Sequence, residues 1–160
     1  MKKHKKRIIV IVAFSLILVV ASVLYVHFSD TNTPWLDTDS GAVKWEGEQK
    51  LQHKTSANNN IAIPGFESLV FTSGQSTQKV NFYNPEENSC LFQLELYADD
   101  SLLWKSGYIE PGKGYYTIEL IEPLAAGTYA GRLHYGCYLA DGTALNSADI
   151  SLQVYVQEES

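Results

Sequence analysis

From residue 61 onward, apolar and polar side chains alternate in short runs that are separated by glycine, proline, asparagine or aspartate. This alternation predicts β-strands, because successive side chains of a strand point to opposite faces of its sheet. The turn residues recur about every ten residues, as in all-β domains. The predicted strands cover residues 61–63, 68–72, 78–83, 91–98, 102–105, 115–121, 128–139 and 150–156.

The strand pattern places the chain in the all-β class. Eight short strands without helices between them favour an immunoglobulin-like antiparallel β-sandwich of about seven to eight strands over an α/β domain. Because side chains two residues apart share a face of the sheet, the alternation also divides the residues of each strand into an inward and an outward set. The predicted inward set is Val80, Phe82, Phe92, Leu94, Leu96, Tyr116, Ile118, Leu120, Leu133, Tyr135, Leu139, Ile150, Leu152, Val154 and Val156.

A different pattern occupies the beginning of the chain. Residues 8–28 are apolar except for two serines, one tyrosine and one histidine. A helix of this length spans about 31 Å, which matches the hydrocarbon core of a bilayer. Residues 1–7 carry five lysines or arginines, and by the positive-inside rule they are expected in the cytoplasm. The sequence therefore predicts a single-pass membrane protein whose signal-anchor helix leaves the rest of the chain outside the cell.

The alternative interpretation of this segment is a cleavable signal peptide. Val20-Ala21-Ser22 offers small residues near a cut site, as a signal peptidase requires. The apolar run continues beyond that point as Val23-Leu24-Tyr25-Val26, and no cysteine is present for lipid attachment. The length of the run favours the uncleaved anchor.

Residues 29–60 are polar and contain two turn-rich stretches, so they are predicted to form a stalk between the membrane helix and a sandwich domain of residues 61–157. Trp35, Leu36 and Trp45 are apolar exceptions that suit contact with the domain or with the membrane surface. The pattern favours a solvated linker that carries a few isolated aromatic side chains.

Composition and charge narrow the classes of function. The chain has 160 residues, enough for one domain with its own core. Its net charge is −6, and once the five basic residues of the first seven are set aside, seven basic and 18 acidic side chains remain, a net charge of −11. Such a surface repels phosphate backbones, which excludes nucleic acid as an expected partner.

Two resemblances add to this picture. Leu124-Ala125-Ala126-Gly127-Thr128-Tyr129 resembles the tyrosine corner of immunoglobulin-like sandwiches, in which a tyrosine hydroxyl hydrogen-bonds backwards to the backbone. The order of the anchor and several loop motifs resembles small, N-terminally membrane-anchored proteins of Gram-positive bacteria. This second resemblance implies an extracellular immunoglobulin-like domain without an established function, and it supplies no site residues. The loop motifs are Trp45-Glu46-Gly47, Ile61-Ala62-Ile63-Pro64-Gly65-Phe66, Asn84-Pro85-Glu86-Glu87-Asn88 and Ile109-Glu110-Pro111-Gly112.

The two cysteines are predicted to form a disulfide. Cys90 shares parity with inward Phe92, and Cys137 shares parity with inward Tyr135, so both face the core of an exported domain. A bridge across the core would close a long loop and stabilise the fold by about 4 kcal/mol. The alternative is two separate buried thiols that pack as small hydrophobic groups.

Catalytic and metal-binding patterns are weak. No nucleophile elbow and no His-Glu-x-x-His motif is present, and His53 and His134 are the only histidines beyond residue 28. The spacing from Asp37 matches a calcium loop poorly, because its fifth and sixth positions are Gly41 and Ala42. The expected protein is therefore not an enzyme and has neither cofactor nor metal; the alternative is a small cell-envelope enzyme with a dispersed site.

Outward positions of three predicted strands supply the candidate binding residues. Tyrosine on an exposed sheet offers apolar area and a hydroxyl at low entropy cost, which suits contact with a protein or a glycan. The same tyrosines also stabilise a sheet by cross-strand pairing alone, which is the competing explanation. We expect a binding or assembly module that is anchored in the lipid bilayer by residues 8–28 and contacts an envelope protein or glycan through this face or through a strand edge. The candidate binding residues are Glu95, Tyr97, Arg132, His134, Tyr138, Gln153 and Tyr155.

Overall fold

The computed structural model describes residues 36–47, 51–54 and 61–159, with side chains for all of these except 51–54. This part of the chain contains ten strands. They are β1 (Val43–Lys44), β2 (Leu51–Lys54), β3 (Ala62–Pro64), β4 (Ser68–Thr72), β5 (Thr77–Tyr83), β6 (Leu91–Ala98), β7 (Ser101–Lys105), β8 (Lys113–Glu119), β9 (Gly127–Tyr138) and β10 (Ala148–Gln157).

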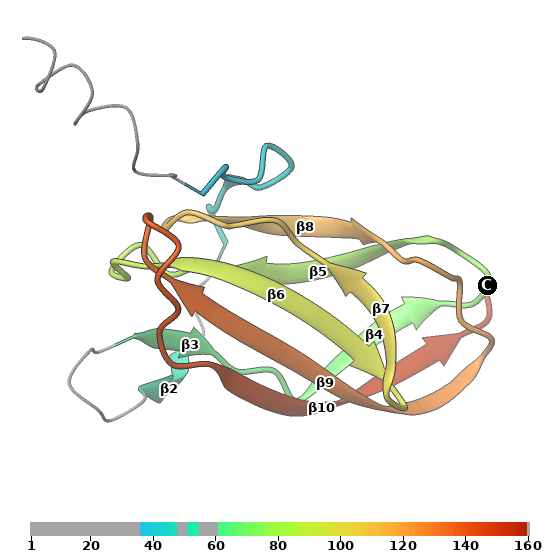
Figure 1. Ribbon diagram of the computed structural model, residues 1–160. Helices are drawn as coiled ribbons and strands as arrows, with labels where there is room; N and C mark the ends of the chain where they lie inside the picture. The colour runs from blue at the N-terminus through green and yellow to red at the C-terminus, as the bar shows by residue number, and fades with distance from the viewer. Residues whose placement is uncertain (1–35, 48–50, 55–60, 160) are drawn as a thin grey trace, which may run out of the picture. The chain divides into compact units, whose positions relative to one another are not determined.

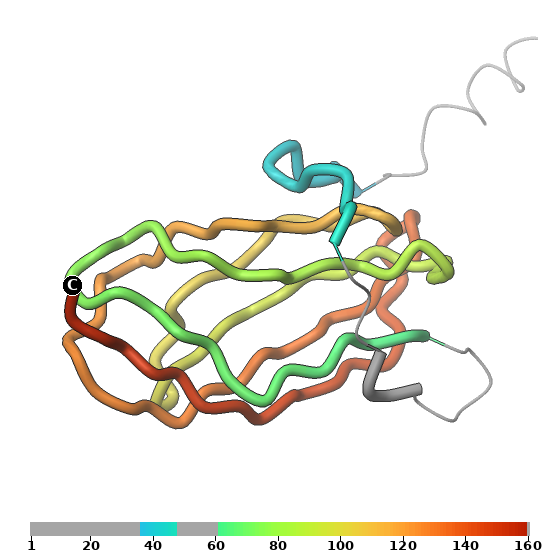
Figure 2. Tube along the Cα trace, turned by 180° about the vertical axis from the view of Figure 1, so that it is seen from behind, coloured from blue at the N-terminus to red at the C-terminus, as the bar shows by residue number. Residues whose placement is uncertain are grey.

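The strands form two main sheets and one short ribbon. A five-stranded sheet has the order β4-β10-β9-β6-β7, a three-stranded sheet has the order β1-β8-β5, and β2 pairs with β3. Only the β10–β4 pair is parallel among the described ladders. The two main sheets lie as facing layers (Figures 1 and 2). The predicted all-β class with two sheets is confirmed.

The alternation of apolar and polar residues predicted the bounds of eight observed strands to within two residues. The strands predicted at 68–72 and 91–98 have the observed bounds, and the other six are displaced by no more than two residues at either end. Residues 1–28, with the predicted basic segment and membrane helix, lie outside the described residues, so both remain predictions. Within the described ranges, the structure has no helix of the length and apolarity that a membrane span requires.

The core lies between the inner faces of the two sheets. Phe82 of β5 is fully buried and meets Phe66 edge-on at 5.4 Å between ring centroids. On the five-stranded sheet the predicted alternation holds, and the side chains that point inward are nearly inaccessible to solvent. These are Phe92, Leu94, Leu96, Leu133, Tyr135, Leu152, Val154 and Val156.

Two residues predicted to face inward are exposed instead. Tyr116 is 42 % exposed because the ladder between β5 and β8 has an irregularity between Lys79 and Phe82, which changes the parity along β8. Leu139 is 37 % exposed because it follows the last residue of β9, where strand parity no longer applies. Both errors arise where regular pairing is interrupted.

Buried amide side chains join segments that the ladders leave apart. Asn84 is fully buried, and its Nδ2 donates to the carbonyl oxygens of Cys90 and Ile109 at 2.8 and 2.9 Å. Asn88 donates to Asn84 Oδ1 at 2.8 Å and to the carbonyl of Ala62 at 2.9 Å, while its Oδ1 accepts from the Ala62 amide at 2.8 Å. The two amides therefore satisfy buried backbone groups of three different segments.

A third buried amide closes the other end of the sandwich. Gln78 of β5 is 4 % exposed, and its Nε2 donates to the carbonyls of Thr72 and Gln75 at 2.8 Å. Its Oε1 accepts from the Thr72 amide at 2.9 Å. The side chain thus takes the place of a strand ladder between β4 in one sheet and β5 in the other.

The backward hydrogen bond predicted for Tyr129 is present. The Tyr129 hydroxyl donates to the carbonyl of Ala125, four residues upstream, at 2.9 Å. We expect Tyr129→Phe to lower the free energy of unfolding by about 0.5–1.5 kcal/mol, because the carbonyl loses its partner at a site that water can still reach. Chemical denaturation of the fragment 35–160 measures the change.

Tyr155→Phe is the matched control for Tyr129→Phe. Tyr155 is 41 % exposed, so removing its hydroxyl is expected to change the free energy of unfolding by less than about 0.5 kcal/mol. A larger loss for Tyr155→Phe than for Tyr129→Phe would contradict the assigned role of Tyr129.

Candidate functional site

The seven candidate residues lie on the outer face of the five-stranded sheet. The register places Tyr97 of β6 opposite Arg132 of β9, and Glu95 opposite His134. His134 is also opposite Asp149 of β10. Residues directly opposite one another on one face have Cβ atoms about 4.5–5.5 Å apart, close enough for their side chains to interact.

A carboxylate of β6 connects two neighbouring side chains. Glu95 Oε1 accepts from Lys105 Nζ of β7 at 2.8 Å, and Glu95 Oε2 accepts from the Tyr97 hydroxyl at 2.5 Å. The hydrogen bond from Lys105, followed by the one from Tyr97, lowers the pKa of Glu95. Lys105 has a raised pKa through the same bond. Both charges are therefore maintained near neutral pH.

Arg132 extends this arrangement across β9. Its guanidinium carbon lies 3.9 Å from the centroid of the Tyr97 ring, a cation–π contact, and its Nη1 donates to Asp149 Oδ1 at 3.2 Å. His134 Nδ1 lies 2.8 Å from the same carboxylate oxygen. Partial burial raises the pKa of Asp149, but the hydrogen bonds from His134 and Arg132 outweigh it and leave that pKa lowered.

These contacts form one continuous chain of side chains across four strands, which we call the outer-face network. Its charged groups remain accessible: the Arg132 and Asp149 side chains are 38 % and 54 % exposed. The network is thus fixed in geometry by mutual contacts and still faces solvent. Its members, in order of contact, are Lys105, Glu95, Tyr97, Arg132, Asp149 and His134.

The other three candidates share the face and exchange no hydrogen bond with the network within the described ranges. Tyr138 packs edge-on against Tyr108, with 5.2 Å between ring centroids. Gln153 is exposed, and Tyr155 lies opposite Val70 of β4, which is 59 % exposed. Tyr155 and Val70 therefore form an exposed apolar pair on β10 and β4.

Sequence reasoning missed two members of the outer-face network. Asp149 lies one residue before the predicted start of its strand at residue 150, although its parity with Ser151 and Gln153 marks it as outward. Lys105 was placed in a strand, but the pairing of Glu95 with Lys105 depends on a hairpin register that includes an irregularity between Leu96 and Tyr97. Parity could have identified Asp149, whereas no sequence signal identifies the partner of Lys105.

The cysteines are neighbours within one sheet. Cys137 of β9 lies opposite Phe92, so Cys90, two residues before Phe92, is its diagonal neighbour. Both are buried free thiols in the structure. Cys90 lies just before β6 and Cys137 lies in β9, so a bridge would join neighbouring segments of one sheet, and the prediction of a bridge across the core is wrong. A hydrogen bond between the two sulfurs lowers the pKa of Cys90, and the same bond, with burial, raises that of Cys137.

The histidines take part in no metal-binding cluster of the described residues. Among the described residues, no group of three or more His, Cys, Asp or Glu side chains could hold a metal ion. The side chain of His53 lies outside the described residues, so only His134 can be placed.

Comparisons of the chain with protein-family models, with curated proteins and with solved structures gave no match.

The proximity of the two sulfurs gives the predicted disulfide a direct test. We expect Cys90 and Cys137 to be joined in protein taken from its native envelope, because the two residues are diagonal neighbours in one sheet and the compartment is predicted to be oxidising. Mass spectrometry of unreduced peptides should find the bridged pair. Two thiols that alkylate after denaturation without reduction would show that the bridge does not form.

Proposed function

We propose that this chain is a membrane-anchored, extracytoplasmic binding or assembly module without enzymatic activity. It contacts an envelope protein or glycan through the outer face of its five-stranded sheet. The observation that carries the proposal is the outer-face network, an aromatic and charged array that is held in place by contacts and is still open to solvent.

The network suits recognition for two physical reasons. Tyrosine and arginine contribute much of the energy at binding interfaces, and Tyr97 and Arg132 are stacked on one another. Side chains that are already ordered lose less conformational entropy on binding. Tyr155 and Val70 add exposed apolar area on the same face.

The location outside the cytoplasm is supported by the sequence alone. Five basic residues precede the apolar run of residues 8–28, and the chain beyond it has a net charge of −11. Residues 8–28 are proposed to bind the lipid bilayer as a single helix. The acidic remainder disfavours nucleic acid as a partner.

An immunoglobulin-like sandwich is the proposed fold type. The order β10-β9-β6-β7 corresponds to the G, F, C and C′ strands of a variable-type domain, and β5 and β8 correspond to strands B and E. The hydrogen bond from Tyr129 to Ala125 matches the tyrosine corner at the start of strand F.

A strand edge is a second proposed contact surface of the same module. β1 pairs with only two residues of β8, Gly114 and Lys113. The later residues of β8 pair with β5 on one side, and no described strand pairs with them on the other. Such an edge is able to accept an extended segment of another protein.

A small envelope enzyme is the alternative function, and one contact favours it. His134 Nδ1 lies 2.8 Å from Asp149 Oδ1, which is the way a carboxylate orients a catalytic imidazole. In this chain the same carboxylate oxygen also accepts from Arg132. The pair is thereby part of the outer-face network, which favours binding over catalysis.

Site-specific photocrosslinking in intact cells tests the choice of surface. A crosslinker at Gln153, next to the network on the outer face, is expected to capture a discrete partner, and Arg132→Ala is expected to reduce the yield at least about threefold. The fold change corresponds to a loss of about 0.7 kcal/mol in binding free energy. Purified complexes identify whether the partner is a protein or a glycan.

The matched control is a crosslinker at Lys79, which is exposed on β5 in the opposite sheet. The proposal predicts little capture from Lys79 and no effect of Arg132→Ala there. Equal capture from both positions, or capture from Lys79 alone, would show that the five-stranded sheet is not the binding surface.

A further inference from the structure

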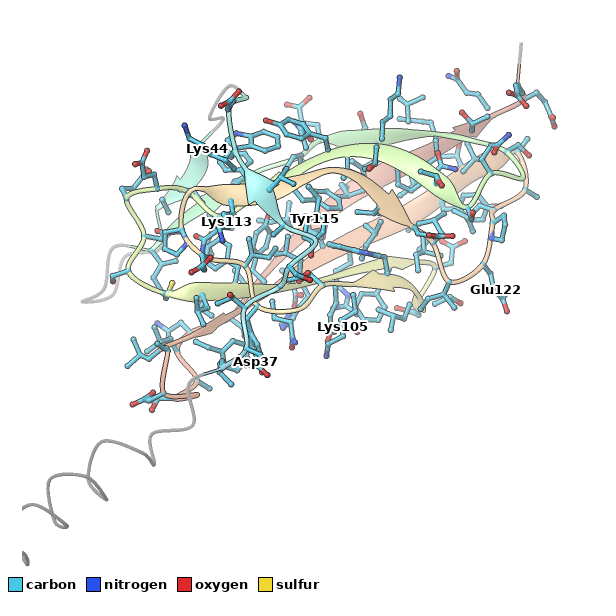
Figure 3. The ribbon with its side chains drawn as sticks, turned by 90° about the horizontal axis from the view of Figure 1, so that it is seen from above. Asp37, Lys44, Lys105, Lys113, Tyr115 and Glu122 are labelled. Atoms are coloured by element: carbon cyan, nitrogen blue, oxygen red, sulfur yellow. The ribbon has the colours of Figure 1, made fainter. Side chains whose placement is uncertain are left out.

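Residues 36–47, which the sequence predicts as part of the stalk, lie against the sandwich domain, and we call them the strap. Figure 3 shows the strap passing over β8 next to Tyr115, with Asp37 and Lys44 on its course. Ala42 in its middle is 7 % exposed. Three backbone amides of the strap donate to loop carbonyls of the domain: Leu36 to Ala140 at 3.0 Å, Asp39 to Tyr108 at 2.8 Å, and Trp45 to Gly112 at 2.8 Å.

The carboxylate of Asp39 is the first anchor of the strap. It accepts from the backbone amide of Gly107 at 2.6 Å, from the amide of Gly41 at 2.8 Å, and from the hydroxyl of Tyr115. Burial raises the pKa of Asp39, but these hydrogen bonds outweigh it and lower that pKa. A Cβ at Gly107 would lie 2.9 Å from Asp39 Oδ2, so only glycine leaves room for the carboxylate.

The ring of Trp45 is the second anchor. It lies between two tyrosines of the three-stranded sheet, stacked on Tyr83 at 4.7 Å and on Tyr116 at 4.6 Å between ring centroids. The next amide, that of Glu46, donates to the Tyr116 hydroxyl at 2.8 Å. The ring of Tyr116, which the ladder irregularity turns outward, forms one wall of the Trp45 site.

The two anchors change the length of the free tether. If the strap were not docked, residues 29–50 would all belong to the free tether between the predicted membrane helix and β2. These 22 residues, fully extended, reach at most about 80 Å. With the strap docked, only residues 29–35 precede the first docked residue, and seven residues reach at most about 25 Å. These are limits set by chain length, whatever conformation the tether adopts.

We propose that the strap is a reach-limiting device, which holds the domain to partners that are embedded in the membrane or lie directly on it. The inference rests on the proposed function and its membrane anchor. It adds to that function that the partner lies in the membrane or directly on its surface. It depends on the two anchors, Asp39 in its glycine-lined seat and Trp45 between two tyrosines. Release of both would more than triple the maximum reach.

Energy transfer between the domain and a labelled bilayer tests the proposal on the full chain. The chain is reconstituted into phosphatidylcholine vesicles that carry rhodamine on a fraction of the headgroups, with a donor dye at Glu122→Cys, an exposed position. Gly107→Ala removes the first anchor, and the double variant with Trp45→Ala removes both. Trp45→Ala alone leaves Asp39 docked and the free tether unchanged, so transfer efficiency is expected to fall in Gly107→Ala and to fall further in the double variant. Tryptic cleavage after Lys44 should become faster in both variants, which reports release of the strap independently.

Two variants serve as matched controls. Gly127→Ala adds the same methyl group, but the nearest atom to that group is a ring carbon of Tyr129 at 3.5 Å, which is an ordinary van der Waals distance. Asp37→Asn changes an exposed side chain of the strap. Both should match the parent chain in energy transfer and in cleavage. Faster cleavage at Lys44 with unchanged transfer would overturn the reach-limiting role. If the parent chain does not sediment with vesicles, the proposed membrane anchor is wrong, and the inference fails with it. Sedimentation is measured separately from energy transfer and cleavage, so the two kinds of failure can be distinguished.

Discussion

The buried amide pair Asn84 and Asn88 is the constraint on which the rest of this structure depends. It holds together segments that no ladder joins, namely Ala62 of β3, Cys90 before β6, and Ile109. Without these side chains, the amide and carbonyl of Ala62 and the carbonyl of Cys90 would each lose a hydrogen bond in a buried environment, and the carbonyl of Ile109 would keep only the Phe92 amide. A sandwich with an irregular end therefore needs amides at this point, and hydrophobic packing alone would not replace them.

The strap and the outer-face network both follow from that junction. Ile109 exchanges two backbone hydrogen bonds with Phe92, at 3.0 and 2.7 Å, and the adjacent Tyr108 carbonyl receives the amide of Asp39. β6 begins at Leu91, beside this junction, and its register with β9 places Tyr97 opposite Arg132. One pair of amides thus lies beside both the strand that carries part of the outer-face network and the loop that receives the strap.

Sequence alternation predicted the strands and the outward set because both depend on a period of two residues. It placed Glu95, Tyr97, Arg132 and His134 on one outward face, but it identified neither their pairing nor the contact of Glu95 with Lys105, which a hairpin irregularity brings in. For the strap, the sequence favoured a solvated linker over contact with the domain, and that choice was wrong, because the anchors join Asp39 and Trp45 to residues more than 35 positions away. Local pattern carries no information about such pairs.

The free energy of unfolding of Asn88→Ala tests the central role of the amide pair most directly. The variant leaves the Ala62 amide and carbonyl and the Asn84 Oδ1 without their partner, so we predict a loss of about 2–4 kcal/mol in urea denaturation of the fragment 35–160. Asn81→Ala, at an exposed position of β5, should change stability by less than about 0.5 kcal/mol. Equal and small losses for the two variants would contradict the account.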